Sequence, residues 1–188
     1  MDFVKVAADF KKLSRHANIS ESFLTNTSND GILTTNDGKN KRRFFMEAVA
    51  VMDILGGAKV LGKKILNRLD MVELGSAGIP KKALLNLAKY LGISTGRMTE
   101  LLPISERTLQ RYAPGEHFDR VVSEQILRIA EVAARGTAVF GDKVKFIKWL
   151  ESENKALGGK TPVSLLVSSF GVEMVLDELG RIEHGVFS

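Results

Sequence analysis

Apolar residues recur at helical spacing along most of this chain, and that periodicity restricts its fold more than any other feature of the sequence. Between Pro80 and Gly92, for example, Leu84, Leu87 and Leu91 fall on one face of a helix. No stretch shows the sustained alternation of apolar and polar residues, closed by hairpin turns, that a β-sheet would require. The sequence therefore predicts an all-α fold, and an apolar content of 44% is sufficient to build its core.

The ends of the expected helices are marked by glycine, proline and short polar side chains. Gly136 is expected to end the helix before it, whereas Asp142 and Thr161 are expected to cap the helices that follow them. Residues Asn18–Asn40, which include the turn signal Asn36-Asp37-Gly38, are too polar to form a core and are expected to be a flexible linker. Helices are accordingly expected over residues 3–16, 44–55, 58–69, 81–91, 119–135, 143–150, 162–167 and 171–179.

The composition and the amino terminus exclude several classes of protein. The chain has no cysteine, so neither a disulfide framework nor a cysteine-based zinc site is expected. Residues 1–5 lack the basic start of a secretory signal, and no stretch reaches the roughly 18 uncharged apolar residues of a membrane span. A soluble cytoplasmic protein without a membrane partner is therefore expected.

Charge is distributed unevenly along the chain. Residues 39–68 contain eight basic and two acidic residues, whereas residues 117–188 contain nine basic and ten acidic ones. A basic middle and a nearly neutral end are consistent with two partners of different electrostatics. They are equally consistent with lysines and arginines that only solvate the surfaces of helices.

Motifs for catalysis are weak in this sequence. Gly57–Lys64 nearly matches a phosphate-binding loop, but Lys64 replaces the hydroxyl that ligates magnesium, and the preceding segment is predicted to be a helix rather than a strand. The three histidines have no partner at metal-ligand spacing, and no nucleophile has an evident general base. We therefore expect that the chain is not an enzyme and that it needs no metal or cofactor.

Residues 93–112 have the pattern of a helix-turn-helix. A short helix is expected to be followed by a turn through Pro103 and by a second helix that begins after Ser105. Ile104 and Leu109 are expected to pack inward and to fix the angle between the two helices. Arginine and glutamine side chains on the exposed side of the second helix can form hydrogen bonds with base edges in the major groove of DNA. The expected DNA-binding residues are Arg97, Ser105, Arg107, Thr108, Gln110 and Arg111.

The local charge limits this interpretation. Residues 94–116 contain three arginines and three glutamates, so this segment alone would neutralise few phosphates and would bind DNA weakly. Contacts to the DNA backbone would have to come from basic residues that fold alongside, namely Lys59, Lys63, Lys64, Arg68, Lys81 and Lys82. A helix-turn-helix that serves only as a packing scaffold is the alternative.

Four blocks of the sequence, taken together and in their order along the chain, indicate a family resemblance. They are Leu101–Arg111, Val139–Asp142, Ala156–Pro162 and Leu179–Ser188. Together they resemble the Xre/ParS/MbcA-type antitoxins of RES–Xre toxin–antitoxin modules, and the last two blocks are the most specific. The resemblance spans about residues 55–188, whereas residues 1–40 have no counterpart.

The resemblance implies a fold and a mechanism. It implies an Xre-like helix-turn-helix domain followed by a small helical toxin-binding domain. It further implies that the protein neutralises a RES-domain toxin, which consumes NAD or transfers from it, by covering the toxin's active-site cleft. Such bacterial antitoxins are homodimers that repress their own operon by binding operator DNA, and they need no cofactor. The expected domains are residues 1–40 (helix and flexible linker), 41–135 (helix-turn-helix) and 136–188 (toxin-binding).

The chemistry of the carboxy-terminal tail fits this role. Its apolar end and terminal carboxylate could enter a narrow cleft, Arg181 suits acidic groups, and Glu183 could meet the basic groups of an NAD site. From composition alone, an ordinary frayed terminus is the alternative. The expected toxin-binding residues are Arg181, Glu183, Gly185, Val186, Phe187 and Ser188.

A tail that blocks a cleft needs a rigid base. The residues expected to form the core of that base are Trp149, Leu150, Leu157, Leu165, Leu166, Phe170, Val175, Leu176 and Leu179. Truncating Trp149 should therefore abolish toxin binding indirectly, by unfolding the base. A dimeric helix-turn-helix transcriptional regulator without a toxin partner is the competing function.

Overall fold

The computed structural model describes the backbone of residues 37–185 and the side chains of residues 43–185 other than that of Arg68. The helix expected over residues 3–16 and most of the expected linker lie outside these residues. From Lys39 onward the chain belongs to one compact unit. Within the described part the chain forms helices and no β-strand, which confirms the all-α prediction.

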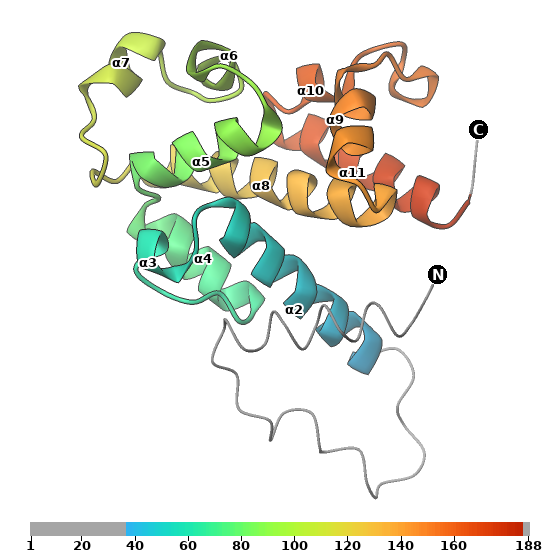
Figure 1. The fold of residues 1–188 in the computed structure, drawn as a ribbon, viewed down its shortest axis with the longest axis horizontal. Helices are drawn as coiled ribbons and strands as arrows, with labels where there is room; N and C mark the ends of the chain where they lie inside the picture. The colour runs from blue at the N-terminus through green and yellow to red at the C-terminus, as the bar shows by residue number, and fades with distance from the viewer. Residues whose placement is uncertain (1–36, 186–188) are drawn as a thin grey trace, which may run out of the picture. The chain divides into compact units, whose positions relative to one another are not determined.

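The helices follow one another along the chain with short connections (Figure 1). The helices predicted over residues 81–91 and 143–150 are confirmed to within one residue at each end, whereas α10 ends earlier than predicted. The bounds are α2 (Asp37–Ile54), α3 (Ala58–Leu61), α4 (Arg68–Ala77), α5 (Lys81–Leu91), α6 (Thr95–Glu100), α7 (Glu106–Arg111), α8 (Arg120–Phe140), α9 (Lys143–Glu151), the 3-10 turn η2 (Lys155–Leu157), α10 (Pro162–Leu165) and α11 (Ser169–Glu183).

Helix α8 is the centre of this unit (Figure 1). It packs against α4, α5, α9 and α11. Its side chains Val122, Ile126, Ile129 and Ala133 are all buried. A helix with such a wide apolar surface is stable only when neighbours cover most of it. Helix α8 therefore joins the N-terminal and C-terminal parts of the unit through one continuous core.

The prediction that Gly136 ends this helix is wrong, because α8 continues to Phe140 and ends at Gly141. Gly141 has the left-handed φ of 64° that favours glycine at a helix end. Gly136 has another role: the ring of Phe146 occupies the position that a β-carbon would take. The glycine thus makes room for a fully buried ring, and the predicted domain boundary at 135/136 falls inside a continuous helix.

The region between α2 and α5 differs from the single helix predicted over residues 58–69. Helix α3 ends after one turn at Gly62, whose φ is 74°, and α4 begins after Asn67. The Asn67 side chain accepts from the backbone N–H of Asp70, and the Asp70 carboxylate accepts from that of Asn67. This capping box starts a new helix, and an Asn-x-x-Asp pattern is the sequence signal that predicts it.

Helix α2 begins earlier than predicted. It includes Asp37 and Gly38, so the turn predicted at this position and the extension of the linker to Asn40 are wrong. The added segment Lys39–Arg43 consists mainly of lysine and arginine, which have high helix propensity. The helix therefore extends beyond the apolar part from which its start was predicted.

The last helix, α11, is longer than the predicted range 171–179. It starts earlier because the Ser168 side chain caps it by accepting from the backbone N–H of Gly171 at 3.1 Å. It ends later, at Glu183, so the first part of the expected tail is helical.

Most of the predicted core around α9, α10 and α11 is confirmed. Phe170 is the exception, because its side chain is 80% exposed. It lies on a different face of α11 from the buried Val172, Val175 and Leu179. The predicted residues that are buried are Leu150, Leu157, Leu166, Val175 and Leu179, and those that pack against the core while partly buried are Trp149, Leu165 and Leu176.

Trp149 belongs to a cluster of three aromatic rings. Its ring centroid lies 5.5 Å from that of Phe140 and 6.3 Å from that of Phe146. Because the side chain is partly buried, we expect Trp149→Ala to lower the free energy of unfolding by about 2 kcal/mol. Urea denaturation followed by circular dichroism measures this change. An unchanged denaturation midpoint would show that the ring cluster contributes no packing energy.

Candidate functional site

Helices α6 and α7 form the predicted helix-turn-helix. Ser94 caps α6 by accepting from the backbone N–H of Arg97 at 3.1 Å, and Ser105 caps α7 by accepting from that of Thr108 at 3.1 Å. The turn between the helices buries two leucines, and Leu109 anchors α7 with only 3% of its surface exposed. The inward packing predicted for Leu109 is therefore confirmed.

The outer side of α7 carries three long polar side chains. Arg107, Gln110 and Arg111 are exposed, and within residues 37–185 none of these side chains has an ion pair or a hydrogen bond. Their spacing of three and four residues places them on one face of the helix. This is the arrangement in which arginine and glutamine can form bidentate hydrogen bonds with guanine and adenine edges.

The other predicted DNA-binding side chains have partners within the chain. The hydroxyls of Ser105 and Thr108 are hydrogen-bonded to each other at 2.9 Å, at the start of α7. The guanidinium of Arg97 forms an ion pair with Glu151 of α9 at 3.0 Å. These three residues thus stabilise the motif, and their contact with DNA remains a prediction.

Two of the lysines that were expected to contact phosphates also have partners. Lys81 Nζ donates to the carbonyl oxygen of Tyr112 at 2.6 Å and so fixes the end of α7. Lys63 donates to Glu73 at 2.7 Å, and this hydrogen bond raises the pKa of the lysine. Lys82 is exposed in the first turn of α5, where its backbone N–H donates to a carbonyl in the loop after α7. Among these three, Lys82 has the best position to reach a DNA backbone next to α7.

Gly57–Lys64 has the local structure of a short helix between two glycine turns rather than that of a phosphate-binding loop. Gly57 precedes α3 and Gly62 follows it, and the chain enters this segment from helix α2 instead of from a strand. Across residues 37–185 no cluster of three or more acidic or histidine side chains could hold a metal ion. None of the helices between residues 37 and 185 combines the length and the apolar composition of a membrane span.

Four charged side chains hold the end of α11, and we call them the charge ring. Glu183 accepts from Arg43 at 3.1 Å and from Arg135 at 2.6 Å, and Glu47 accepts from the same arginines at 3.2 Å and 2.6 Å. The charge ring joins α2, α8 and α11, and only 15% of the Arg135 side chain is exposed. Glu183 thus accepts from two arginines through one carboxylate oxygen, Oε2, and 37% of its side chain stays exposed.

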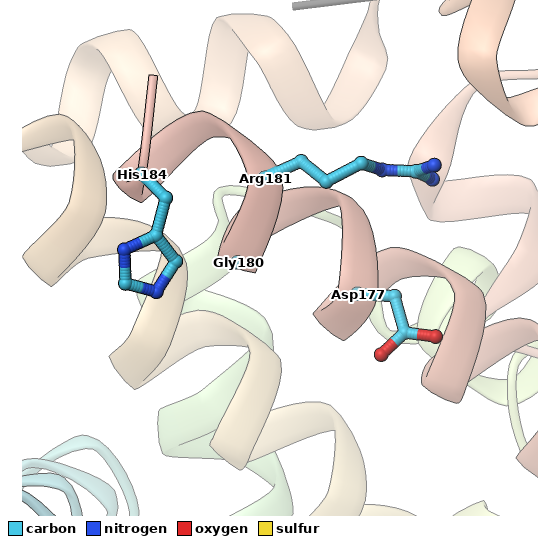
Figure 2. A pocket seen from close by; sticks show the side chains of 4 residues that line it. All are labelled: Asp177, Gly180, Arg181 and His184. Atoms are coloured by element: carbon cyan, nitrogen blue, oxygen red, sulfur yellow. The ribbon is translucent and has the colours of Figure 1, made fainter. Parts of the chain in front are cut away.

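A shallow, open hollow, which we call the groove, lies along the C-terminal half of α11, and Figure 2 shows the side chains that line it. It has a volume of about 390 Å³ and is lined by Asp177, Gly180, Arg181 and His184. Arg181, which was predicted to bind the toxin, forms an ion pair with Glu178 at 2.8 Å. The groove therefore combines a partnered arginine with an open stretch of helix around Gly180.

The predicted toxin-binding residues fall into three places. Arg181 and Glu183 lie on α11, and Gly185 lies in the turn after it with a φ of 69°. This left-handed conformation ends the helix and favours glycine. Val186, Phe187 and Ser188 lie outside the described residues, so their roles remain predictions.

Sequence reasoning identified neither the charge ring nor the groove. The members of the ring are far apart in the chain, with Arg43 and Glu183 separated by 140 positions. The groove did leave a signal, because Asp177, Gly180 and His184 are spaced by three and four residues and so share one face of a helix.

Comparison with known proteins identifies the family. Residues 70–131 match the model of the antitoxin Xre-like helix-turn-helix domain, and residues 135–185 match that of the antitoxin Xre/MbcA/ParS C-terminal toxin-binding domain. A protein of Yersinia enterocolitica named Antitoxin Xre is 38% identical over 122 residues, which cover 64% of this chain and 72% of that protein. The chain belongs to the Xre antitoxin family. An Antitoxin Xre of Photorhabdus laumondii is 29% identical over 113 residues, or 59% of this chain and 76% of that relative.

Membership of the Xre antitoxin family assigns general roles to the two parts of the unit. The exposed face of α7 belongs to the helix-turn-helix domain, and the groove along α11 belongs to the toxin-binding domain. Neither domain is that of an enzyme family, so this Xre antitoxin acts by binding rather than by catalysis.

Proposed function

We propose that this chain neutralises a RES-domain toxin that consumes NAD, by covering the toxin's active-site cleft with its carboxy-terminal end. We further propose that it acts as a homodimer in the bacterial cytoplasm and represses its own operon by binding operator DNA. One observation carries the proposal: a single compact unit contains an exposed helix-turn-helix face and the toxin-binding domain of an antitoxin family.

The positions of the two surfaces support binding to both partners. Helix α7 and the C-terminal end of α11 lie at opposite ends of the unit (Figure 1). DNA bound against α7 would therefore leave α11 accessible to a toxin. The alternating charges of the charge ring hold α11 against α2 and α8, which provides the rigid base that a covering tail needs.

The neighbouring gene provides the test of this function. A RES-domain reading frame next to the gene for this chain should arrest growth and deplete NAD when it is expressed alone. Co-expression of this chain should restore both growth and NAD. Persistent arrest, despite normal amounts of the folded chain, would reject the antitoxin proposal. The dimeric regulator without a toxin partner would then be the better interpretation, because it requires only the helix-turn-helix.

Arg107→Ala and Arg111→Ala are each expected to weaken operator binding by about 1–3 kcal/mol and to relax the preference for particular bases. Both side chains are exposed and have no partner in the described part of the chain, so their loss should leave the fold intact. Fluorescence anisotropy with operator and scrambled duplexes, at several salt concentrations, measures the effect. Arg128→Ala is the control for loss of a positive charge alone, because Arg128 lies on another helix, α8. There its side chain pairs with Glu173 at 3.6 Å. An equal loss on both duplexes would make the two arginines phosphate contacts.

A further inference from the structure

Gly180 is an unusual residue at its position in α11. It lies in the last turns of the helix, where glycine is less favourable than alanine because it has more backbone freedom to lose on folding. A β-carbon built at Gly180 would have no neighbouring atom within 4 Å. Packing within the described chain therefore does not require a glycine here.

Two other glycines in helices of this chain, Gly136 and Gly171, show the contrast. A β-carbon at Gly136 would overlap the ring of Phe146, and one at Gly171 would overlap the carbonyl oxygen of Leu165. Each of these glycines is thus explained by close approach of another part of the chain. By the same physical reasoning, the bare backbone at Gly180 suits close approach of a group that does not belong to the described chain.

The side chains around Gly180 indicate the chemistry of that group. Figure 2 shows Asp177 and His184 projecting on the same side of α11, before and after Gly180. Among the described residues the Asp177 carboxylate has neither an ion pair nor a hydrogen bond, whereas Arg181 is paired with Glu178. The groove therefore offers an available carboxylate next to bare helix backbone, which suits a basic group on a closely packed partner.

We infer that the face formed by Asp177, Gly180 and His184 is a direct docking surface for the toxin. The toxin places a small residue or a stretch of main chain against Gly180 and a lysine or arginine near Asp177. This inference rests on the proposed function and specifies where on α11 the toxin binds. One observation, together with one expectation from the proposed function, favours the toxin as the occupant. The face lies within residues 135–185, which match a toxin-binding domain, and a toxin that binds NAD needs basic groups near its cleft for the phosphates.

The test measures binding of full-length variants to a catalytically inactive form of the neighbouring RES-domain protein, by isothermal titration calorimetry. Gly180→Ala should melt at the same or a higher temperature than wild type and bind about tenfold more weakly, and Gly180→Leu about a hundredfold more weakly. Asp177→Asn should weaken binding about tenfold. Met174→Trp adds bulk to another exposed face of α11 and should bind like wild type.

The outcomes separate this inference from the proposed function. If the wild-type chain does not bind the RES-domain protein, the proposed function fails. If wild type binds and the Gly180 variants bind equally well, the function stands and the docking face is wrong. Equal weakening by Met174→Trp would also overturn it, because any added bulk on α11 would then suffice. The remaining case is that this face binds a second copy of the chain, and sedimentation of the chain alone tests it. Weaker self-association of Gly180→Leu, with unchanged affinity for the toxin, would assign the face to a second copy.

Discussion

Gly171→Ala is expected to lower the free energy of unfolding by about 3 kcal/mol or more, because the added methyl group has no space. An ideal β-carbon at Gly171 overlaps the carbonyl oxygen of Leu165 and lies 2.8 Å from its carbonyl carbon. Both are backbone atoms, so rotation of a side chain cannot relieve the overlap. The variant must instead move α10 away from α11, which would disturb the buried side chains Val163 and Leu166.

Gly180→Ala is the matched control, since it makes the same exchange in the same helix at a site with open space. It should leave the free energy of unfolding unchanged or raise it by about 0.5–1 kcal/mol. Urea denaturation followed by circular dichroism compares the two variants directly. Equal midpoints for Gly171→Ala and Gly180→Ala would contradict the tight packing between α10 and α11.

Deleting Val186–Ser188 is expected to abolish protection against the toxin while leaving folding and DNA binding intact. The deletion leaves α11, the turn at Gly185 and the charge ring in place, because all of these precede residue 186. It removes the apolar pair Val186-Phe187 that is proposed to enter the cleft. We expect the affinity for the RES-domain protein to fall about a hundredfold or more, since a buried aromatic anchor often dominates an interface.

The point of truncation determines how this result can be interpreted. Deleting residues 181–188 would also remove Glu183, which hydrogen-bonds to Arg43 and Arg135, and would leave the mostly buried Arg135 with one carboxylate fewer. Loss of protection could then follow from a destabilised α11. The shorter deletion keeps these contacts, so a normal melting temperature together with full protection would show that the last three residues do not cover the active site.

The helix-turn-helix could be predicted from sequence because its determinants are local. Ser105 marks the start of α7 through a cap to a residue three positions later, and the spacing of Arg107, Gln110 and Arg111 determines a common face. Asp142 likewise caps α9 by accepting from the backbone N–H of Lys145 at 2.8 Å. Such short-range hydrogen bonds leave a signal in the sequence, although those that start α4 at Asn67 and α11 at Ser168 were missed.

Other errors arose where distant parts of the chain decide the outcome. Gly136 has the sequence signature of a helix end, but it lies inside α8, where the absence of a side chain leaves space for the ring of Phe146 on the next helix. Glu183 was expected to lie in a tail after the last helix, but it belongs to α11 and accepts hydrogen bonds from arginines on α2 and α8. Phe170 was expected in the core because its side chain is apolar, but it is exposed. The face of α11 that packs inward carries Val172, Val175 and Leu179 instead. The contacts of Gly136 and Glu183 join parts of the chain that local spacing does not relate.

Titrating the purified RES-domain toxin with this chain, while NAD turnover is followed, measures active-site coverage most directly. If the carboxy-terminal end covers the cleft, turnover should fall to zero as bound toxin approaches saturation, and higher NAD concentrations should weaken the inhibition because NAD and the tail compete for one site. The chain that ends at Gly185 should inhibit only at much higher concentrations. A full-length chain that binds the toxin tightly and leaves NAD turnover unchanged would contradict this mechanism.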